Sequence, residues 1–402
     1  MPEPGGKPGD GLPPQPFFAS PAQRMARARE VFFEQGQSPG GLVQQEVLQS
    51  WHRCLRAGLE PEQSLQPEPV SALRLDSALR RSRLLIKAAA PEMQQLEQAL
   101  DGTACRILLV DAEGLVLRKG QGQRAEGAER AQASVLGAVA RLGVNVSEAA
   151  LGTNAPALVL RSGRACSVTA GEHFFSGIAP LHCTAAPIHD AQGRLAGALN
   201  LAVDTRSGGF RFEPAALVGM VAAAIENRLL CAQSQALIVL EFQLSREGLG
   251  SAFSALAGVS PEGQVLWLNA VAQSLSGGPA EGGVAVEGLL GLSAARLRAM
   301  LGAAPCQVLL PNGLRLWMRA SLGPGTRLAA QEELAVAPAP VAHPAVCVEE
   351  APARLLDRNR ELILATVAQC GGNISLAAQR LGISRGRIYR QLTTQPPASR
   401  PG

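Results

Sequence analysis

The segment GGNISLAAQRLGISRGRIYRQL, residues 371–392, has the pattern of two short helices joined by a turn. Apolar residues recur three or four positions apart on both sides of Gly382, which predicts one buried face on each helix. Asn373 and Ser384 are placed to cap the two helices, and Gly382 suits the left-handed turn between them. Ala378 is small where the second helix crosses the first. This pattern predicts a helix-turn-helix.

The second of these helices carries the basic residues that DNA recognition requires. Arg387 and Arg390 lie on the face opposite Ile388, and Arg385 lies in the first turn. Arginine binds phosphate or grips guanine with two hydrogen bonds, so this face suits the major groove. The plainer interpretation is a helical hairpin with a solvated basic face. The residues predicted to contact DNA are Asn373, Ser375, Ser384, Arg385, Arg387, Tyr389 and Arg390.

The charge of the 402-residue chain supports the same interpretation. The net charge is only +4, but residues 353–402 hold eight arginines against two acidic residues, so the rest of the chain is slightly negative. Such a local positive field is typical of a domain that binds a polyanion. The Pro- and Gly-rich start resembles no signal peptide, the apolar run at residues 215–225 is short for a membrane span, and eight cysteines form no CxxC. We therefore expect a cytoplasmic protein without a membrane partner.

Changes of hydrophobic period divide the chain into domains and predict a multidomain α+β fold. The runs CRILLVDAEGLVLR, CTAAPIHDAQGRLAGALNLAVD and CQVLLPNGLRLWMRA are each predicted as a β-hairpin, and a long helix is expected at residues 212–235. The predicted parts are a disordered N-terminus (1–35), a helical segment (36–92), a sheet domain with an exit helix (93–235), a second sheet domain with a weaker sequence pattern (236–322), an Ala/Pro linker (323–350) and an all-α domain (351–395).

Several segments resemble the acetoin-catabolism-regulator branch of the nitrogen-type sigma-factor activators. The resemblance implies a GAF-like sensory domain with an antiparallel sheet flanked by helices, then a PAS-like domain, then a Fis-type helix-turn-helix. It is weakest over the PAS-like part. The segments that carry it are SWHRCLRAGLEP (50–61), ALGTNAPALVL (150–160), AGEHFFSGIAPLHCTAAPIHDAQGRLAGALNLAVD (170–204), SPEGQVLWLNAVAQSL (260–275) and NRELILATVAQCGGNISLAAQRLGISRGRIYRQL (359–392).

One departure from that family concerns its ATPase domain. A P-loop needs a lysine followed by Ser or Thr to hold the phosphates and the metal. The sequence has three lysines, Lys7, Lys87 and Lys119, which precede Pro, Ala and Gly. We therefore expect no ATP hydrolysis and no remodelling of polymerase by that route.

The resemblance also implies a small-molecule effector in the GAF-like domain. Such sites are apolar cavities with a few convergent polar groups. The plainer interpretation is that the same residues are structural, with Asn154 capping a helix, His173 a satisfied anchor and Cys183 a small core residue. The candidate effector-binding residues are Asn154, His173, Phe174, Phe175, His182, Cys183 and Thr184.

The sequence favours no metal, no cofactor and no enzymatic activity. Histidines and cysteines gather between residues 166 and 189, but without metal-binding spacing. A redox enzyme using Cys183 would need a lowered thiol pKa, which His182 only weakly suggests.

The predicted function is a homodimeric, effector-responsive regulator that binds double-stranded DNA and acts by promoter occupancy, with RNA polymerase as a possible further partner. The alternative is an interaction protein that pairs with a full-length activator and inhibits its ATPase.

Overall fold

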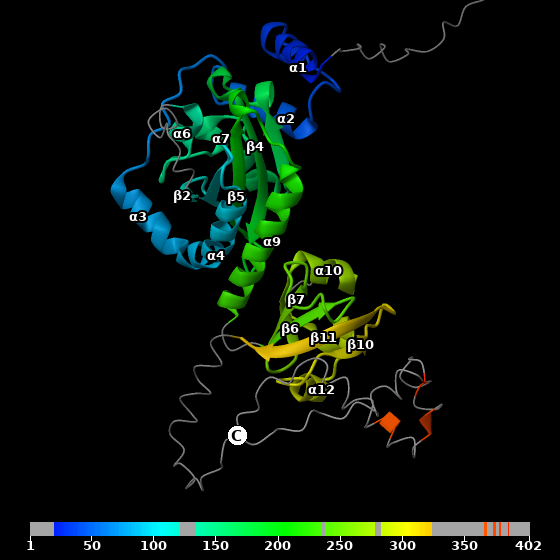
Figure 1. The fold of residues 1–402 in the computed structure, drawn as a ribbon. Coiled ribbons are helices and arrows are strands. Elements are labelled where there is room, and N and C mark those ends of the chain that lie inside the picture. Colours follow the sequence, from blue (N-terminus) through cyan, green and yellow to red (C-terminus); the bar gives the residue numbers. More distant parts are fainter. Residues whose placement is uncertain are drawn as a thin grey trace, which may run out of the picture. The chain divides into compact units, whose positions relative to one another are not determined.

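The computed structural model describes residues 20–120, 134–234, 238–277 and 283–323, and six residues near the C-terminus: Thr366, Val367, Asn373, Ile374, Ala378 and Arg385. The chain divides into two compact units, Met1–Val336 and Ala337–Gly402. The first unit contains two antiparallel sheets with helices packed on them (Figure 1). The predicted α+β class is therefore confirmed.

The first sheet has five strands and follows the predicted hairpins. Its order is β2-β1-β5-β4-β3, and every neighbouring pair is antiparallel. In both hairpins the first Asp of the turn, Asp111 or Asp190, accepts two backbone N–H bonds through its Oδ1. The turn glycines Gly114 and Gly193 have φ of +89° and +70°, which explains the DAEG and DAQG signals. The strands are β1 (Arg106–Asp111), β2 (Val116–Lys119), β3 (Cys166–Thr169), β4 (Leu181–His189) and β5 (Leu195–Asp204).

Helices cover both faces of this sheet. Successive side chains point to opposite faces, so Leu108 and Val110 join one hydrophobic core while Ile107 and Leu109 join the other. The long helices α4 (Arg83–Ala99) and α9 (Pro214–Gln233) cover the second of these faces. The remaining helical elements of residues 20–207 are α1 (Pro21–Arg29), the π-helix η1 (Glu30–Glu34), α2 (Gln45–Arg56), α3 (Ala72–Arg81), α6 (Val135–Val139), α7 (Glu148–Leu151), α8 (Ala155–Ser162), and the 3-10 turns η2 (Ala170–Glu172), η3 (Ser176–Ile178) and η4 (Thr205–Ser207).

Residues 21–34 are helical, so the disorder predicted over residues 1–35 is wrong for this part of the segment. Ser20 caps α1 by accepting the N–H of Gln23 at 3.3 Å. Met25 and Phe32 are buried in the same hydrophobic core as Leu108 and Val110, on what we call the inner face of the sheet. The prediction failed because the Pro/Gly-rich composition ends at about Ser20, where the apolar periodicity already begins. Residues 1–19 lie outside the described residues.

The second sheet has six strands in the order β10-β11-β6-β7-β8-β9. The hairpin predicted around PNG is confirmed, with Gly313 at φ +89° in its turn. One face of this sheet forms a separate core with three short helices. The elements are β6 (Ile238–Gln243), β7 (Ala255–Val259), β8 (Gln264–Leu268), α10 (Ala270–Ser276), β9 (Val284–Ala285), α11 (Val286–Leu290), α12 (Ala294–Ala299), β10 (Cys306–Leu309) and β11 (Arg315–Leu322).

Helix α9 contributes to both sheet domains. Its last turns pack Leu230 against Trp267 of the second sheet. Asn227 donates to the carbonyl of Ala252 at 3.1 Å and accepts from Asn269 Nδ2 at 2.8 Å, so both ends of its amide are bonded. The predicted exit helix is thus confirmed. Its side chains thus join the two sheet domains through hydrogen bonds and apolar packing.

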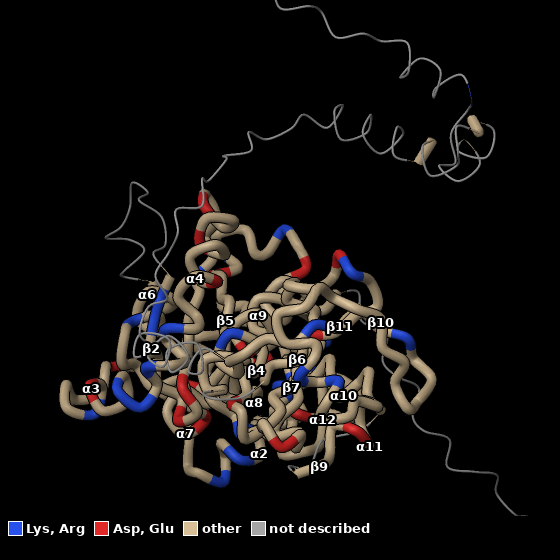
Figure 2. Tube along the Cα trace, turned by 90° about the horizontal axis from the view of Figure 1, so that it is seen from below, with Lys and Arg blue, Asp and Glu red and all other residues tan. Residues whose placement is uncertain are grey.

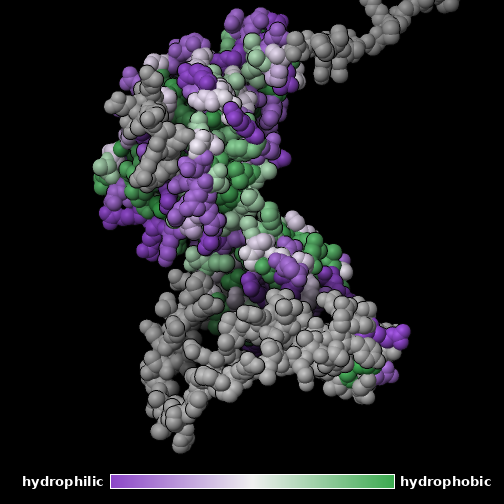
Figure 3. Space-filling model, in the orientation of Figure 1, coloured by the Kyte–Doolittle hydropathy of each residue, from purple (hydrophilic) through white to green (hydrophobic). Residues whose placement is uncertain are grey.

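Much of α9 remains apolar on its outer side. Within the described residues it is the one helix long and apolar enough to cross a bilayer, a test that core helices of soluble proteins also pass. Hydrophobic residues gather in the middle of Figure 3, and Met220 of α9 and the preceding Phe212 are exposed. Along the described parts of the chain trace, positions of Lys and Arg are interspersed with positions of Asp and Glu (Figure 2).

Candidate effector-binding and DNA-binding sites

An internal cavity of about 20 Å³ lies between the inner face of the first sheet and the helices α6, α7 and α8. A cavity of that size holds about one water molecule. Its walls are aliphatic except for the side chains of Asn154, His173, Cys183 and Asn200. None of the described residues that line it has an ionised side chain.

His173 presents a hydrogen-bond acceptor at this cavity. Its Nδ1 lies 3.0 Å from the carbonyl oxygen of Ala170, and a carbonyl only accepts, so Nδ1 carries the proton. Nε2 therefore has a free lone pair, and among the described residues it has no hydrogen-bond partner. Complete burial lowers the pKa of His173 to about 4, so the ring is neutral at neutral pH.

Asn200 is a second polar group of the cavity, and the sequence analysis missed it. It lies in β5, on the same face as Ala198 and Ala202, and is 2% exposed. Its Oδ1 is buried and has no hydrogen-bond partner within the described part of the chain. A signal was present in the sequence, since a single Asn interrupts the apolar strand GALNLAV. Buried amides are normally paired, so an unpaired one at a cavity indicates a missing partner.

Asn154 lies at the cavity, but both polar atoms of its amide are already hydrogen-bonded to the backbone. Its Oδ1 accepts the N–H of Ala157 at 3.0 Å and so caps α8. Its Nδ2 donates to the carbonyls of Val146 at 3.0 Å and Gly152 at 2.9 Å. Asn154 thus shapes the wall, as the plainer interpretation of the sequence had it.

Cys183 contributes a protonated thiol. Burial raises its pKa to about 12, and burial also raises the pKa of the nearby Cys166 to about 12. A thiolate is therefore scarcely populated at neutral pH, and the lowered pKa that a redox enzyme needs is not found at Cys183. No group of three or more His, Cys, Asp or Glu side chains able to hold a metal occurs among the described residues.

The other four predicted effector residues lie outside the cavity. Phe174 and Phe175 are buried and pack edge to face at 5.2 Å behind it. His182 and Thr184 alternate with Cys183 along β4 and so point away from it. His182 packs on the Phe210 ring at 4.7 Å, and Thr184 bonds the Ser167 hydroxyl at 2.8 Å. The side-chain alternation of a strand separates these residues from Cys183.

The loop that carries His173 is held by the N-terminal helix. Arg29 donates from Nη1 to the carbonyls of Gly171 at 3.0 Å and His173 at 2.8 Å, and from Nη2 to that of Phe174 at 3.2 Å. The guanidinium also lies 4.7 Å from the centre of the Phe33 ring. A planar guanidinium is well suited to bind several carbonyl oxygens at once, because its N–H donors have a fixed, fork-like geometry. These hydrogen bonds from Arg29 hold the backbone of the loop that carries the His173 side chain.

Replacing Arg29 by Gln should therefore lower the free energy of unfolding by about 2–3 kcal/mol, since three carbonyls lose a charged donor in a partly buried place. Urea denaturation measures this. The matched control is Arg27→Gln on the same helix, where the exposed pair with Glu30 contributes little. Equal effects of the two changes would contradict the role given to Arg29.

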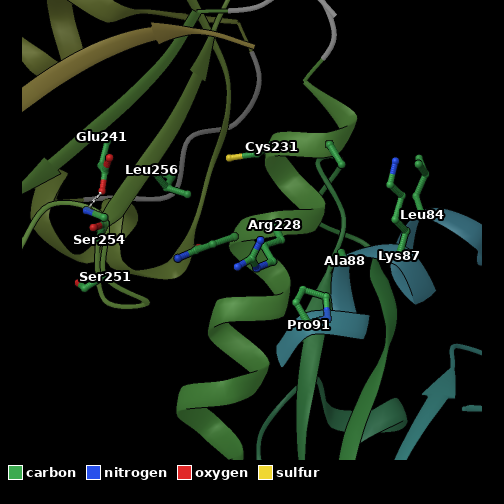
Figure 4. A pocket seen from close by; sticks show the side chains of 13 residues that line it. Leu84, Lys87, Ala88, Pro91, Arg228, Cys231, Glu241, Ser251, Ser254 and Leu256 are labelled. Atoms are coloured by element: carbon green, nitrogen blue, oxygen red, sulfur yellow. Dashed lines mark hydrogen bonds between the residues drawn. The ribbon is translucent and has the colours of Figure 1, made fainter. Parts of the chain in front are cut away.

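A larger cleft of about 670 Å³ opens between α4, α9 and the second sheet domain (Figure 4). Lys87 and Arg228 line one side, and Ser254 and Glu241 the other. Most of its polar groups are already paired, because Arg228 bonds Glu92, Glu241 bonds Arg319 at 2.5 Å and Ser254 bonds the carbonyl of Gly248. The internal cavity, with two unpaired buried atoms, is the better candidate for a specific ligand.

The predicted DNA-binding segment is described at four positions. Asn373 lies just before the helical Ile374, where the sequence placed a cap, and Ala378 is helical and 6% exposed, as expected for the crossing point. Arg385 is helical and exposed. The other predicted contacts, Ser375, Ser384, Arg387, Tyr389 and Arg390, lie outside the described residues.

Two known families match this chain. Residues 20–218 match the family described as "MimR, N-terminal domain", and residues 357–393 match "Bacterial regulatory protein, Fis family". The chain thus carries a regulator's N-terminal domain followed by a Fis-type domain, and the resemblance to acetoin-type regulators is confirmed.

Curated relatives include transcriptional regulators. The acetoin dehydrogenase operon transcriptional activator AcoR of Bacillus subtilis is 27% identical over 170 residues, 42% of this chain and 27% of the relative. The acetoin catabolism regulatory protein of Cupriavidus necator is 30% identical over 184 residues, 45% of this chain and 27% of the relative. An uncharacterized 47.3 kDa protein of Rhodococcus erythropolis is 30% identical over 236 residues, 56% of this chain and 51% of the relative. The matches thus span about a quarter to a half of these relatives.

Among solved structures, the E. coli DhaR(N)-DhaL complex aligns over 70% of this chain and all of its own chain, with a TM-score of 0.42 and 18% identity.

Proposed function

We propose that this protein is a transcriptional regulator that binds DNA through its Fis-type domain and senses a small molecule in its first sheet domain. The match to the Fis family over residues 357–393 carries the proposal, because it includes the whole of the predicted basic helix. The buried Ala378 and the exposed Arg385 support it. Regulators of acetoin and glycerol operons among the relatives support the same role.

The effector site of this proposal is the cavity at His173 and Asn200. Its two unpaired buried atoms are the support, since each such atom costs about 1–3 kcal/mol unless a partner is supplied. An effector that fills the cavity must move one of its walls. One of these walls is the short helix α6, five residues long, which contributes Leu136 and Val139.

We infer a homodimer in which α9 contacts its counterpart. An apolar groove of about 820 Å³ is lined by Leu100, Phe212, Met220 and Phe253, with small residues of α9 between them. Exposed apolar side chains gathered at one place, such as Phe212, Met220 and Phe253, support a contact surface here. A dimer would also present two Fis-type domains to two half-sites about one helical turn apart.

In this proposal the protein acts by occupying DNA, because no lysine of the chain is followed by Ser or Thr as a P-loop requires. The second candidate, supported by the relatives' greater length, is pairing with a full-length activator and inhibiting it. Purified protein should accordingly hydrolyse ATP no faster than a buffer blank. Turnover that copurifies with the protein through two columns would contradict the proposal.

Salt dependence distinguishes the two candidates. Binding to an operator duplex should fall linearly with salt on a log–log plot, with a slope of about −0.9 for each phosphate contact. Fluorescence anisotropy between 50 and 300 mM KCl, about the range in which counterion release is resolved, measures the slope. A slope near zero, with a second regulator recovered in pull-downs, would favour the interaction protein.

A further inference from the structure

We infer that the cavity at His173 is a binding site for one ordered water molecule, which donates one hydrogen to His173 Nε2 and the other to Asn200 Oδ1. Two observations carry the inference: the two unpaired acceptors and the size of the cavity. The inference goes beyond the proposed function, because it names a molecule that the fold itself binds at this place, with or without an effector.

Both unpaired atoms can only accept a hydrogen bond. The carbonyl oxygen of Ala170 lies 3.0 Å from His173 Nδ1 and keeps the proton there, so Nε2 has a lone pair and no hydrogen. Asn200 Oδ1 is a carbonyl oxygen, and it lacks a donor among the described residues. A partner for both residues must therefore supply two donors. A hydroxyl group has one hydrogen, whereas a water molecule has two.

The size of the cavity selects water among the partners that have two donors. A buried water needs roughly 10–15 Å³, and this cavity has about 20 Å³. A primary amide also has two N–H donors, but its carbonyl group and the molecule that carries it need more room. An ammonium ion is small enough, but none of the described residues that line the cavity is a carboxylate, and a buried cation without a counter-charge is costly.

Cys183 supplies a donor for the oxygen of this water. It lines the same cavity, and burial raises the pKa of its thiol to about 12, so the sulfur keeps its hydrogen at neutral pH. A thiol is a weak donor, and a water that donates twice still has lone pairs to accept with. The imidazole, the amide and the thiol together give the water three partners, the usual number for a buried water.

This water sets a requirement for the proposed effector site. An ordered water costs affinity when a ligand displaces it with a group that cannot reproduce its hydrogen bonds. An effector that takes its place must therefore bring two donors, because both acceptors belong to the protein.

NMR of the full-length protein tests the site directly. The chain has five histidines, so labelling histidine with ¹³C and ¹⁵N gives few ring signals, and the signal lost in His173→Leu belongs to His173. The ring proton Hδ2 lies next to Nε2 and away from the Nδ1 proton. We expect a nuclear Overhauser effect between Hδ2 and the water resonance, with the negative sign of a long-lived water. The exposed ring of His52 is the control, because short-lived surface water gives the opposite sign.

The variants Asn200→Val and His173→Leu test whether the water bridges the two residues. Each change removes one acceptor and should raise the equilibrium constant for unfolding in urea. Because one water links the two acceptors, the effect of the double variant should be about tenfold smaller than the product of the single effects. The matched control is Ser50→Ala, since Ser50 is buried and bonds Thr153 at 2.7 Å but does not line the cavity. Its effect should multiply with that of Asn200→Val to within about twofold.

A negative Overhauser effect at Hδ2, together with coupled effects of the two variants, is the result that the inference predicts. If the native protein gives no such effect at Hδ2, the cavity binds no long-lived water and the inference is overturned. An Overhauser effect with effects of the two variants that simply multiply would also overturn it, because the water would then not bridge the two residues. Operator binding measured on the same samples tests the regulator function separately.

Discussion

Replacing Arg387 and Arg390 together by alanine should weaken DNA binding at least about a hundredfold and leave both sheet domains folded. Each arginine of a recognition helix contributes about 1–3 kcal/mol when it contacts a base or a phosphate. The two lie three residues apart in the segment that matches the Fis family, and the helical period of the sequence predicts that they face away from Ile388. Anisotropy titration of a duplex carrying a mapped binding site measures the loss.

The matched control removes the same charge elsewhere. Arg296 and Arg298 on α12 are exposed, and neither makes an ion pair with a described residue. Changing both to alanine lowers the net charge by the same two units. If that variant loses as much affinity as the Arg387/Arg390 variant, non-specific attraction rather than a recognition helix explains the binding.

Trp51→Ala should lower the free energy of unfolding of the first sheet domain by about 4 kcal/mol. Trp51 is fully buried, and its ring packs against Phe32 at 5.3 Å and Phe33 at 5.0 Å. Its Nε1 donates to the carbonyl of Glu172 at 2.8 Å. Truncation of a buried tryptophan leaves a large cavity and typically costs about 3–5 kcal/mol. Here it also frees the loop before His173.

Trp51→Phe is the conservative variant for comparison with Trp51→Ala. It keeps much of the apolar volume and loses the bond to Glu172, so a cost of about 1–2 kcal/mol is expected. Urea denaturation followed by far-UV circular dichroism compares the two. If Trp51→Ala costs less than about 1 kcal/mol, the N-terminal helices are not integral to the core as the structure has them.

Turn chemistry and strand alternation made the sheets predictable. The Asp-x-x-Gly turns at Asp111 and Asp190 stand between apolar runs, and both hairpins formed there. The exit helix was predictable because α9 contains few helix-breaking residues. The start of the helix at Pro21 was not predictable, because a Pro/Gly-rich composition precedes it and its burial depends on a sheet far along the chain.

The candidate cavity was predicted only in part. His173 and Cys183 were found through the resemblance, whereas Phe174, Phe175, His182 and Thr184 lie outside the cavity. Sequence proximity cannot distinguish the two faces of a strand until its register is known. Asn200 was not predicted, because it is of interest only for an amide oxygen without a hydrogen-bond partner among the described residues. That feature depends on how the side chains pack.

Genome-wide mapping of the binding sites of this protein tests the central claim most directly. We expect a limited set of discrete sites with a shared, two-fold symmetric sequence, and we expect those sites to disappear in the Arg387→Ala, Arg390→Ala variant. Absence of enriched sites for the native protein, while the folded chain copurifies with another regulator, would contradict the account.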